Sequence, residues 1–311
     1  MAGSTSRAWQ SRLLVWGKWL WLALVLFFAF LYLGRKGGEV WLALGRMSWQ
    51  QVLLAVLSLV AAKVLLVYAL QISVRQVGFN LPRLGAFSVY NYSQLAKYTP
   101  GSIWQFVSKA AWYALRGLKP DQIRDAIVLE TVSEPAGACL VAVLFAAGWL
   151  PLISRQLPVA AGSAGLAVLA GAAGLLVWWV LGKRDRAQRW ISGLPRFALA
   201  MLPVQLGIWL ILGAGFHALR VGFDPAPLTH SLGLFGLAYI LGFIVPVAPA
   251  GLGIRESVLV LGMNLPPAQA WAIAGAHRVL FLLVEIALAA LAWGLEAARS
   301  RREKQRADQC Q

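Results

Sequence analysis

The chain has 311 residues, of which 59% are hydrophobic and only 13% are charged, and its formal net charge is +16. A soluble domain needs a polar surface that this composition cannot supply, and several segments approach the ~20 apolar residues that span a bilayer. We therefore expect an all-α polytopic membrane protein rather than a soluble enzyme or binding domain.

The high positive charge invites a nucleic-acid-binding interpretation, but the positions of the basic residues argue against it. Most Lys and Arg residues lie in short loops between apolar segments, as in the cytoplasmic loops of membrane proteins. The basic tail, residues 299–311, is expected to contact anionic lipid headgroups. Cys139, Cys310 and three scattered histidines lack metal-ligand spacing, so we expect no metal, cofactor or disulfide.

The first part of the chain predicts two spans and one interrupted helix. Residues 19–33 are predicted to form a retained first span, because no small-residue cleavage site follows them. A polar connection over 34–50 leads to a second span at 52–70, in which Lys63 would face a polar interior or extend toward the interface. Residues 85–115 are too polar to face lipid and contain Pro100-Gly101, which predicts a re-entrant helical hairpin.

Further along, residues 123–150 are predicted to form a third span. Lys119-Pro120-Asp121 before it is typical of a helix start. Glu130 and Glu134 lie four residues apart, so they share a face of this helix, and at 1.5 Å per residue they approach the bilayer midplane. A Gly- and Ala-rich fourth span is predicted at 159–181, with close helix packing.

The second half repeats this pattern. A fifth span is predicted at 197–219, an interrupted segment at 231–262, and a sixth span at 268–294. The sixth span carries Arg278 and, seven residues later on the same face, Glu285.

The interrupted segment of the second half contains the most informative stretch, FIVPVAPAGLGIRE, over residues 243–256. Each proline removes an N–H group and clashes with the preceding turn, and the freed backbone groups need partners within a membrane. We predict that one helix ends near Pro246 and a second begins at about Gly253. The alternative is a kinked helix with a structural ion pair, Arg255 and Glu256.

The two halves, about 52–150 and 197–294, are predicted to form an inverted repeat within one membrane domain, residues 1–298. After each interruption comes a turn with the pattern Leu-x-Pro-x-Gln, at 118–122 and 265–269. Counting Lys and Arg on each side places both termini in the cytoplasm, with the two hairpins entering from opposite sides.

Two motifs carry a family resemblance. The sequence KYTPGSIWQ over 97–105, a helix with Glu130, APAGLGIRE over 248–256, and Arg278 together resemble the lysylphosphatidylglycerol synthase transmembrane region. This family includes many stand-alone, flippase-like membrane proteins of about this length, and the resemblance covers about residues 52–294. The chain departs from the commonest pattern at Ala250, which replaces a frequent Gly, and at Thr131, where many members have Arg.

The resemblance implies movement of a phospholipid between leaflets or a related lipid role. Fused relatives have a separate aminoacyltransferase domain, which we do not expect here, so synthesis is not implied. Ser133 beside Glu134 is a weak nucleophile–base pair, and we expect no catalytic residues.

We expect the two interrupted segments to meet near the membrane centre and to form a substrate site. Backbone N–H groups after each interruption, with Arg255 and Arg278, would bind a phosphate. Glu130, Glu134 and Glu256 would face a cationic headgroup or carry a proton. The candidate substrate-binding residues are Pro100, Gly101, Trp104, Glu130, Glu134, Gly251, Gly253, Arg255, Glu256, Arg278 and Glu285. Alternatively, these charges neutralise one another as packing contacts.

The function predicted from the sequence is a flippase for a phospholipid or lipid-linked glycan in a bacterial cytoplasmic (inner) membrane. Its expected partners are membrane lipids, either an anionic phospholipid or a lipid-linked sugar, and not nucleic acid. The alternative is a non-transporting partner of a lipid-modifying enzyme or glycosyltransferase. The lipid that is moved and the oligomeric state stay open.

Overall fold

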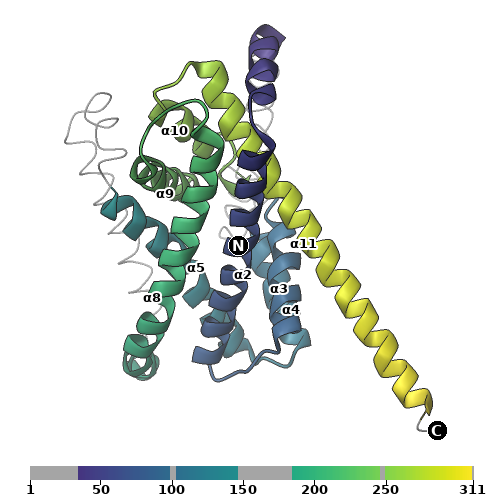
Figure 1. Ribbon diagram of the computed structural model, residues 1–311. Helices are drawn as coiled ribbons and strands as arrows, with labels where there is room; N and C mark the ends of the chain where they lie inside the picture. Colours follow the sequence, from purple (N-terminus) through teal and green to yellow (C-terminus); the bar gives the residue numbers. More distant parts are fainter. Residues whose placement is uncertain (1–33, 99–102, 146–183, 246–248, 310–311) are drawn as a thin grey trace, which may run out of the picture.

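A computed structural model describes residues 34–98, 103–145, 184–245 and 249–309 of the chain (Figure 1). The described part is helical and contains no strand. Its elements in chain order are α2 (Trp49–Gln76), α3 (Arg83–Ala96), α4 (Trp104–Leu115), α5 (Pro120–Leu144), α8 (Arg184–Arg220), α9 (Leu228–Ile244), the 3₁₀ turn η2 (Pro249–Gly251), α10 (Ile254–Gly262) and α11 (Pro267–Gln309).

Four of the described helices are long and apolar enough to cross a membrane. They span Trp49–Gln76, Pro120–Leu144, Gly193–Arg220 and Pro267–Glu303. This confirms the expected class, a helical membrane protein. The predicted spans at 19–33 and 159–181 lie outside the described residues.

Local sequence explains where two of these helices begin. Ser48 caps α2 by accepting a hydrogen bond from the backbone N–H of Gln51, whose side chain in turn accepts one from the Ser48 N–H. Pro120 lies in the first turn of α5 and Asp121 lies beside it, as the sequence predicted.

The predicted polar connection before α2 is largely helical instead. Residues 34–45 form a helix, which is supported by a Lys36–Glu39 ion pair three residues apart. Val40 and Ala43 pack against Ala268 and Ala272 near the start of α11. Tertiary packing therefore orders a segment whose composition alone favours a loop.

The helix interruption in the second half lies where the sequence predicted it. α9 ends at Ile244 and α10 begins at Ile254, with η2 between them. The backbone turns through positive φ angles of 51° at Ala250, 71° at Gly251 and 86° at Gly253. Among the described residues, Ala250 is the only non-glycine with a positive φ angle, a conformation that glycine adopts without a Cβ clash.

The first interrupted segment has the predicted two arms. α3 ends at Ala96 and α4 begins at Trp104; Pro100 and Gly101 lie outside the described residues. α3 and α4 lie side by side, and α3 also packs against α11 (Figure 1).

Residues 299–309 of the predicted basic tail are helical. α11 is a single helix of 43 residues that includes 299–309, and its C-terminal part extends away from the other helices (Figure 1, yellow). The side chains Arg299, Arg301, Arg302 and Arg306 are exposed on this extension.

Close contacts between the long helices depend on small residues. α2 packs along α8, and α5 along α9. A Cβ at Gly236 of α9 would lie 2.9 Å from the Ala138 carbonyl oxygen of α5, and one at Gly213 of α8 would lie 2.7 Å from a Leu232 methyl carbon of α9. These approaches match the small-residue packing of helices in membranes.

We predict that Gly236→Ala lowers the stability of the folded protein by about 1–3 kcal/mol, because the backbone carbonyl of Ala138 cannot move aside as a side chain can. Gly275→Ala in α11 is the matched control, since nothing lies within 4 Å of its Cβ position. The control should raise stability by up to ~1 kcal/mol through helix propensity. Thermal unfolding in detergent measures both, and equal effects of the two substitutions would contradict the packing account.

Candidate functional site

A buried carboxylate on α11 joins three separate elements. Glu285 Oε1 accepts hydrogen bonds from the ammonium groups of Lys63 on α2 and of Lys97, which follows α3; the Lys97 contact measures 2.5 Å. The hydroxyl of Tyr98 donates to Oε2 at 2.8 Å. Lys63 is 2% exposed and Glu285 is 1% exposed. Charged hydrogen bonds in such an apolar setting are strong, and removing one partner is costly.

Aromatic rings complete the surroundings of both ammonium groups. The Phe281 ring centroid is 4.3 Å from Lys63 Nζ and 4.9 Å from Lys97 Nζ, and Tyr90 lies 5.5 Å from Lys63 Nζ. Ring faces attract cations, so these rings partly replace the water that the lysines lack.

A second charged group lies at the interruption between α9 and α10. Glu256 Oε2 accepts a hydrogen bond from the Gly253 N–H at 2.7 Å, which caps α10. Its Oε1 lies 3.5 Å from Nε of Arg278 on α11. Arg278 Nη2 donates to the Ala250 carbonyl oxygen at 3.0 Å. Two backbone groups freed by the helix interruption are thus satisfied by side chains, as burial requires.

Arg278 also connects the two interrupted segments. Its Cζ lies 5.9 Å from the ring centroid of Tyr98, which follows α3, while its Nη2 contacts Ala250 between α9 and α10. Tyr98, at the described end of the first interrupted segment, and Ala250, in the second, therefore both lie near Arg278 of α11.

Arg255 occupies a slot that only glycines leave open. A Cβ at Gly242 would lie 2.3 Å from Arg255 Cγ, and one at Gly251 would lie 2.9 Å from Arg255 Cδ. The guanidinium carbon lies 4.8 Å from the Tyr239 ring centroid and 5.7 Å from that of Phe235. Among the described residues no carboxylate forms an ion pair with Arg255.

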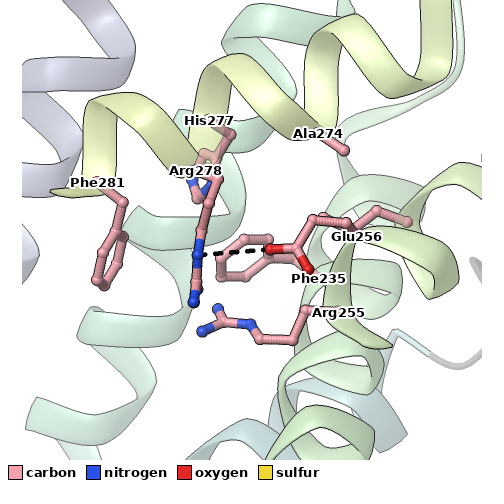
Figure 2. Close-up of a pocket in the computed structure, with 8 residues that line it drawn as sticks. Phe235, Arg255, Glu256, Ala274, His277, Arg278 and Phe281 are labelled. Carbon is pink, nitrogen blue, oxygen red and sulfur yellow. Dashed lines mark ion pairs between the residues drawn. The ribbon is translucent and has the colours of Figure 1, made fainter. Parts of the chain in front are cut away.

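The two guanidinium groups border one pocket. Figure 2 shows Arg255 and Arg278 side by side, with the Glu256 carboxylate next to Arg278. The cavity volume of this pocket is about 10 Å³, which is room for about one water molecule. It is lined by Phe235, Arg255, Glu256, Leu259, Ala274, His277, Arg278 and Phe281.

His277, which also lines this pocket, has an unsatisfied polar atom. Its side chain is 4% exposed and packs among the rings of Phe216, Phe235 and Phe281. Nε2 is buried and has no hydrogen-bond partner among the described residues. A buried polar atom of this kind costs free energy unless a ligand or water meets it.

Glu130 and Glu134 share a face of α5 but have separate partners. Glu130 Oε1 accepts a hydrogen bond from Lys109 Nζ of α4 at 2.6 Å. Glu134 Oε1 accepts one from the Tyr239 hydroxyl of α9 at 2.7 Å. Neither carboxylate lines the pocket of Arg255 and Arg278.

Three residues predicted to bind the substrate, Gly251, Gly253 and Trp104, have other surroundings than expected. The Gly253 N–H, expected to receive a phosphate, is occupied by Glu256. Gly251 packs closely against the Arg255 side chain. Trp104, at the start of α4, is 49% exposed and does not line the pocket.

Several residues that contact the predicted site residues were not among the candidates from the sequence. Lys63 and Lys97 were recognisable as cations within the predicted membrane segments, but nothing in the sequence pairs them with Glu285. Lys109 lies on a polar arm, where a charge carries little information. Tyr98, Tyr239 and His277 gave no spacing signal, because aromatic residues are frequent throughout membrane helices.

The buried charges do not cancel. The cations around these groups are Lys63, Lys97, Lys109, Arg255 and Arg278, and the carboxylates are Glu130, Glu134, Glu256 and Glu285. Positive charge is in excess in the described part of this interior.

No protein-family model matches the chain, and comparison with curated proteins finds no match.

We predict that Gly242→Ala destabilises the protein by displacing the Arg255 side chain, and that Arg255→Ala removes most of that penalty. Measured by thermal unfolding, the double variant should be more stable than the sum of the single effects predicts, by ~1 kcal/mol or more. Gly275→Ala combined with Arg255→Ala is the control pair and should be additive, because Gly275 has no neighbour at its Cβ position. Additive behaviour of the Gly242 pair would rule out the slot as the place that holds Arg255.

Proposed function

We propose that the chain is a flippase-type transporter that moves the headgroup of a phospholipid or lipid-linked glycan between the leaflets of a bacterial cytoplasmic membrane. The observation that carries the proposal is the guanidinium pair, Arg255 and Arg278, at a helix interruption. Among the described residues, Arg255 forms no ion pair with a carboxylate, and Nε2 of His277, which lines the same pocket, has no hydrogen bond.

The chemistry required of a flippase agrees with this arrangement. A phosphate that leaves water for an apolar slab loses its hydration, and the cost falls if fixed cations replace the lost water. Guanidinium groups bind phosphate oxygens with directed, charge-assisted hydrogen bonds. Arg278 is already oriented by Ala250 and Glu256, so little ordering remains to be done when an anion binds.

The proposed architecture has six spans and two re-entrant hairpins in an inverted repeat. One repeat comprises α2, the α3–α4 hairpin and α5, and the other comprises α8, the α9–α10 segment and α11. Each has a long helix, an interrupted pair of shorter helices and a second long helix. Inverted repeats and interrupted helices around one site are recurrent in alternating-access transporters, and the resemblance to the lysylphosphatidylglycerol synthase transmembrane region supports the same proposal.

A protein that only assembles with a lipid-modifying enzyme or glycosyltransferase does not need buried, unmatched cations, because surface contacts suffice for docking. A measurement of lipid transport therefore distinguishes the proposed flippase from this non-transporting alternative.

We predict that Arg278→Ala abolishes leaflet exchange of a fluorescently labelled anionic phospholipid in vesicles that contain the purified protein. Loss of Arg278 removes a phosphate-binding group and leaves the Ala250 carbonyl unsatisfied. Arg299→Ala is the control, because Arg299 pairs with Glu303 on the exposed extension of α11 and should transport normally. Folding is checked by size-exclusion chromatography. Normal exchange by folded Arg278→Ala would contradict the site, and no exchange by the unmodified protein would favour the docking alternative.

The proposed topology predicts that both termini are cytoplasmic, and Cys310 provides a natural probe of the C-terminus. In a Cys139→Ala background, a membrane-impermeant thiol reagent should label Cys310 only after the cells are permeabilised. Labelling in intact cells would place the C-terminus outside and overturn the proposed orientation.

A further inference from the structure

The group formed by Lys63, Lys97 and Glu285 is a short distance further along α11 than the pocket of Arg255 and Arg278, here called the arginine pocket. Arg278 and Glu285 are seven residues apart, which corresponds to ~10 Å along a helix. Phe281 lies between them: its ring lines the arginine pocket and also contacts both lysine ammonium groups. The two charged groups are therefore neighbours, with the aromatic side chains of Phe281 and Tyr98 in contact with both.

The group of Lys63, Lys97 and Glu285 contains two ammonium groups but only one carboxylate. Two ammonium groups share Glu285 Oε1, and the other oxygen accepts a bond from the neutral Tyr98 hydroxyl. In the described part of the chain no second carboxylate forms an ion pair with either lysine. The formal charge of the group is thus +1, and an unmatched ammonium in an apolar environment is costly.

The two lysines differ in how firmly they are held. Lys63 is 2% exposed, and its only hydrogen bond in the described structure is to Glu285. The Lys97 side chain is 15% exposed, follows the end of α3 and has a neutral second partner, the Gln94 side chain at 3.0 Å. Lys97 is the ammonium group that can turn toward another anion while Glu285 keeps Lys63.

We infer that Lys97 is a second phosphate-binding group, reached from the arginine pocket past Phe281. The inference rests on the proposed function and narrows its substrate to an anionic phosphodiester headgroup. One phosphodiester carries a single negative charge, which neutralises the group of Lys63, Lys97 and Glu285. A headgroup with additional positive charge, such as an aminoacylated one, would restore the excess and is disfavoured.

Because Glu285 competes with the headgroup for the lysines, removing its charge should strengthen anion binding. We predict that Glu285→Gln raises the affinity for phosphatidylglycerol roughly tenfold, the size of one charge interaction at a partly screened site. Lys97→Gln should lower it by a similar factor, because the remaining pair of Lys63 and Glu285 is neutral. A carboxylate that serves only packing would give no gain of binding when it is replaced by Gln.

The experiment uses the full chain in detergent and counts bound lipid by native mass spectrometry during titration with phosphatidylglycerol. Phosphatidylethanolamine, which adds an ammonium group to the phosphate, is titrated in parallel and should bind more weakly. Arg116→Gln is the matched control, since Arg116 pairs with Glu296 away from this group and should bind like the unmodified chain. Inorganic phosphate is added as a competitor: displacement of the lipid identifies the free anion as the ligand, whereas retention identifies the lipid headgroup.

The outcomes separate this inference from the proposed function. Unchanged or weaker phosphatidylglycerol binding by folded Glu285→Gln overturns the Lys97 site, even if Arg278→Ala abolishes transport. Tighter binding by Glu285→Gln together with normal transport by Arg278→Ala supports the Lys97 site and overturns the flippase mechanism. If Glu285→Gln does not fold, Lys97→Gln alone is sufficient, because undiminished binding by that variant refutes the inference.

Discussion

A helix that stops inside an apolar bundle leaves backbone groups that need partners, and this constraint organises the structure. At the interruption between α9 and α10, the Glu256 carboxylate accepts from the Gly253 N–H and the Arg278 guanidinium donates to the Ala250 carbonyl. The same two side chains contact each other. The charged residues that satisfy the backbone are therefore the ones that border the pocket, so the fold and the site have a common physical origin.

The charge arrangement follows from how each cation is compensated. Lys109 has its own carboxylate in Glu130, and Arg278 shares Glu256 with the α10 backbone. Arg255 is stabilised by the rings of Tyr239 and Phe235 instead of by a carboxylate. Ring faces lower the cost of burying a cation but leave its charge available to an anion, which is the property that a transient binding site requires.

Much of the fold was predictable from the sequence, because apolar length and prolines act locally. The stretch around Pro246 and Pro249 predicted the end of α9 and the start of α10, since proline and glycine limit a helix regardless of its neighbours. The helix at 34–45 was not predictable in this way, because it depends on packing of Val40 and Ala43 against α11.

The site was predictable only as a set of residues. Arg255, Glu256, Arg278 and Glu285 were identifiable as charges in apolar segments. Their partners were not, because pairs such as Lys63–Glu285 lie 222 residues apart in the chain and depend on which helix faces meet. The partners of Glu130 and Glu134 were hidden for the same reason, since these carboxylates contact Lys109 of α4 and Tyr239 of α9.

The length of α11 has a mechanical consequence. One unbroken helix carries Arg278 and Glu285 among the other helices and four exposed arginines beyond them. The distance from Arg278 to Arg306 is ~42 Å along such a helix. A rigid rod that pivots by about 5° near Arg278 would displace its far end by about 4 Å on this geometry. A local adjustment around Arg278 would therefore become a measurable movement of charge at the end of α11.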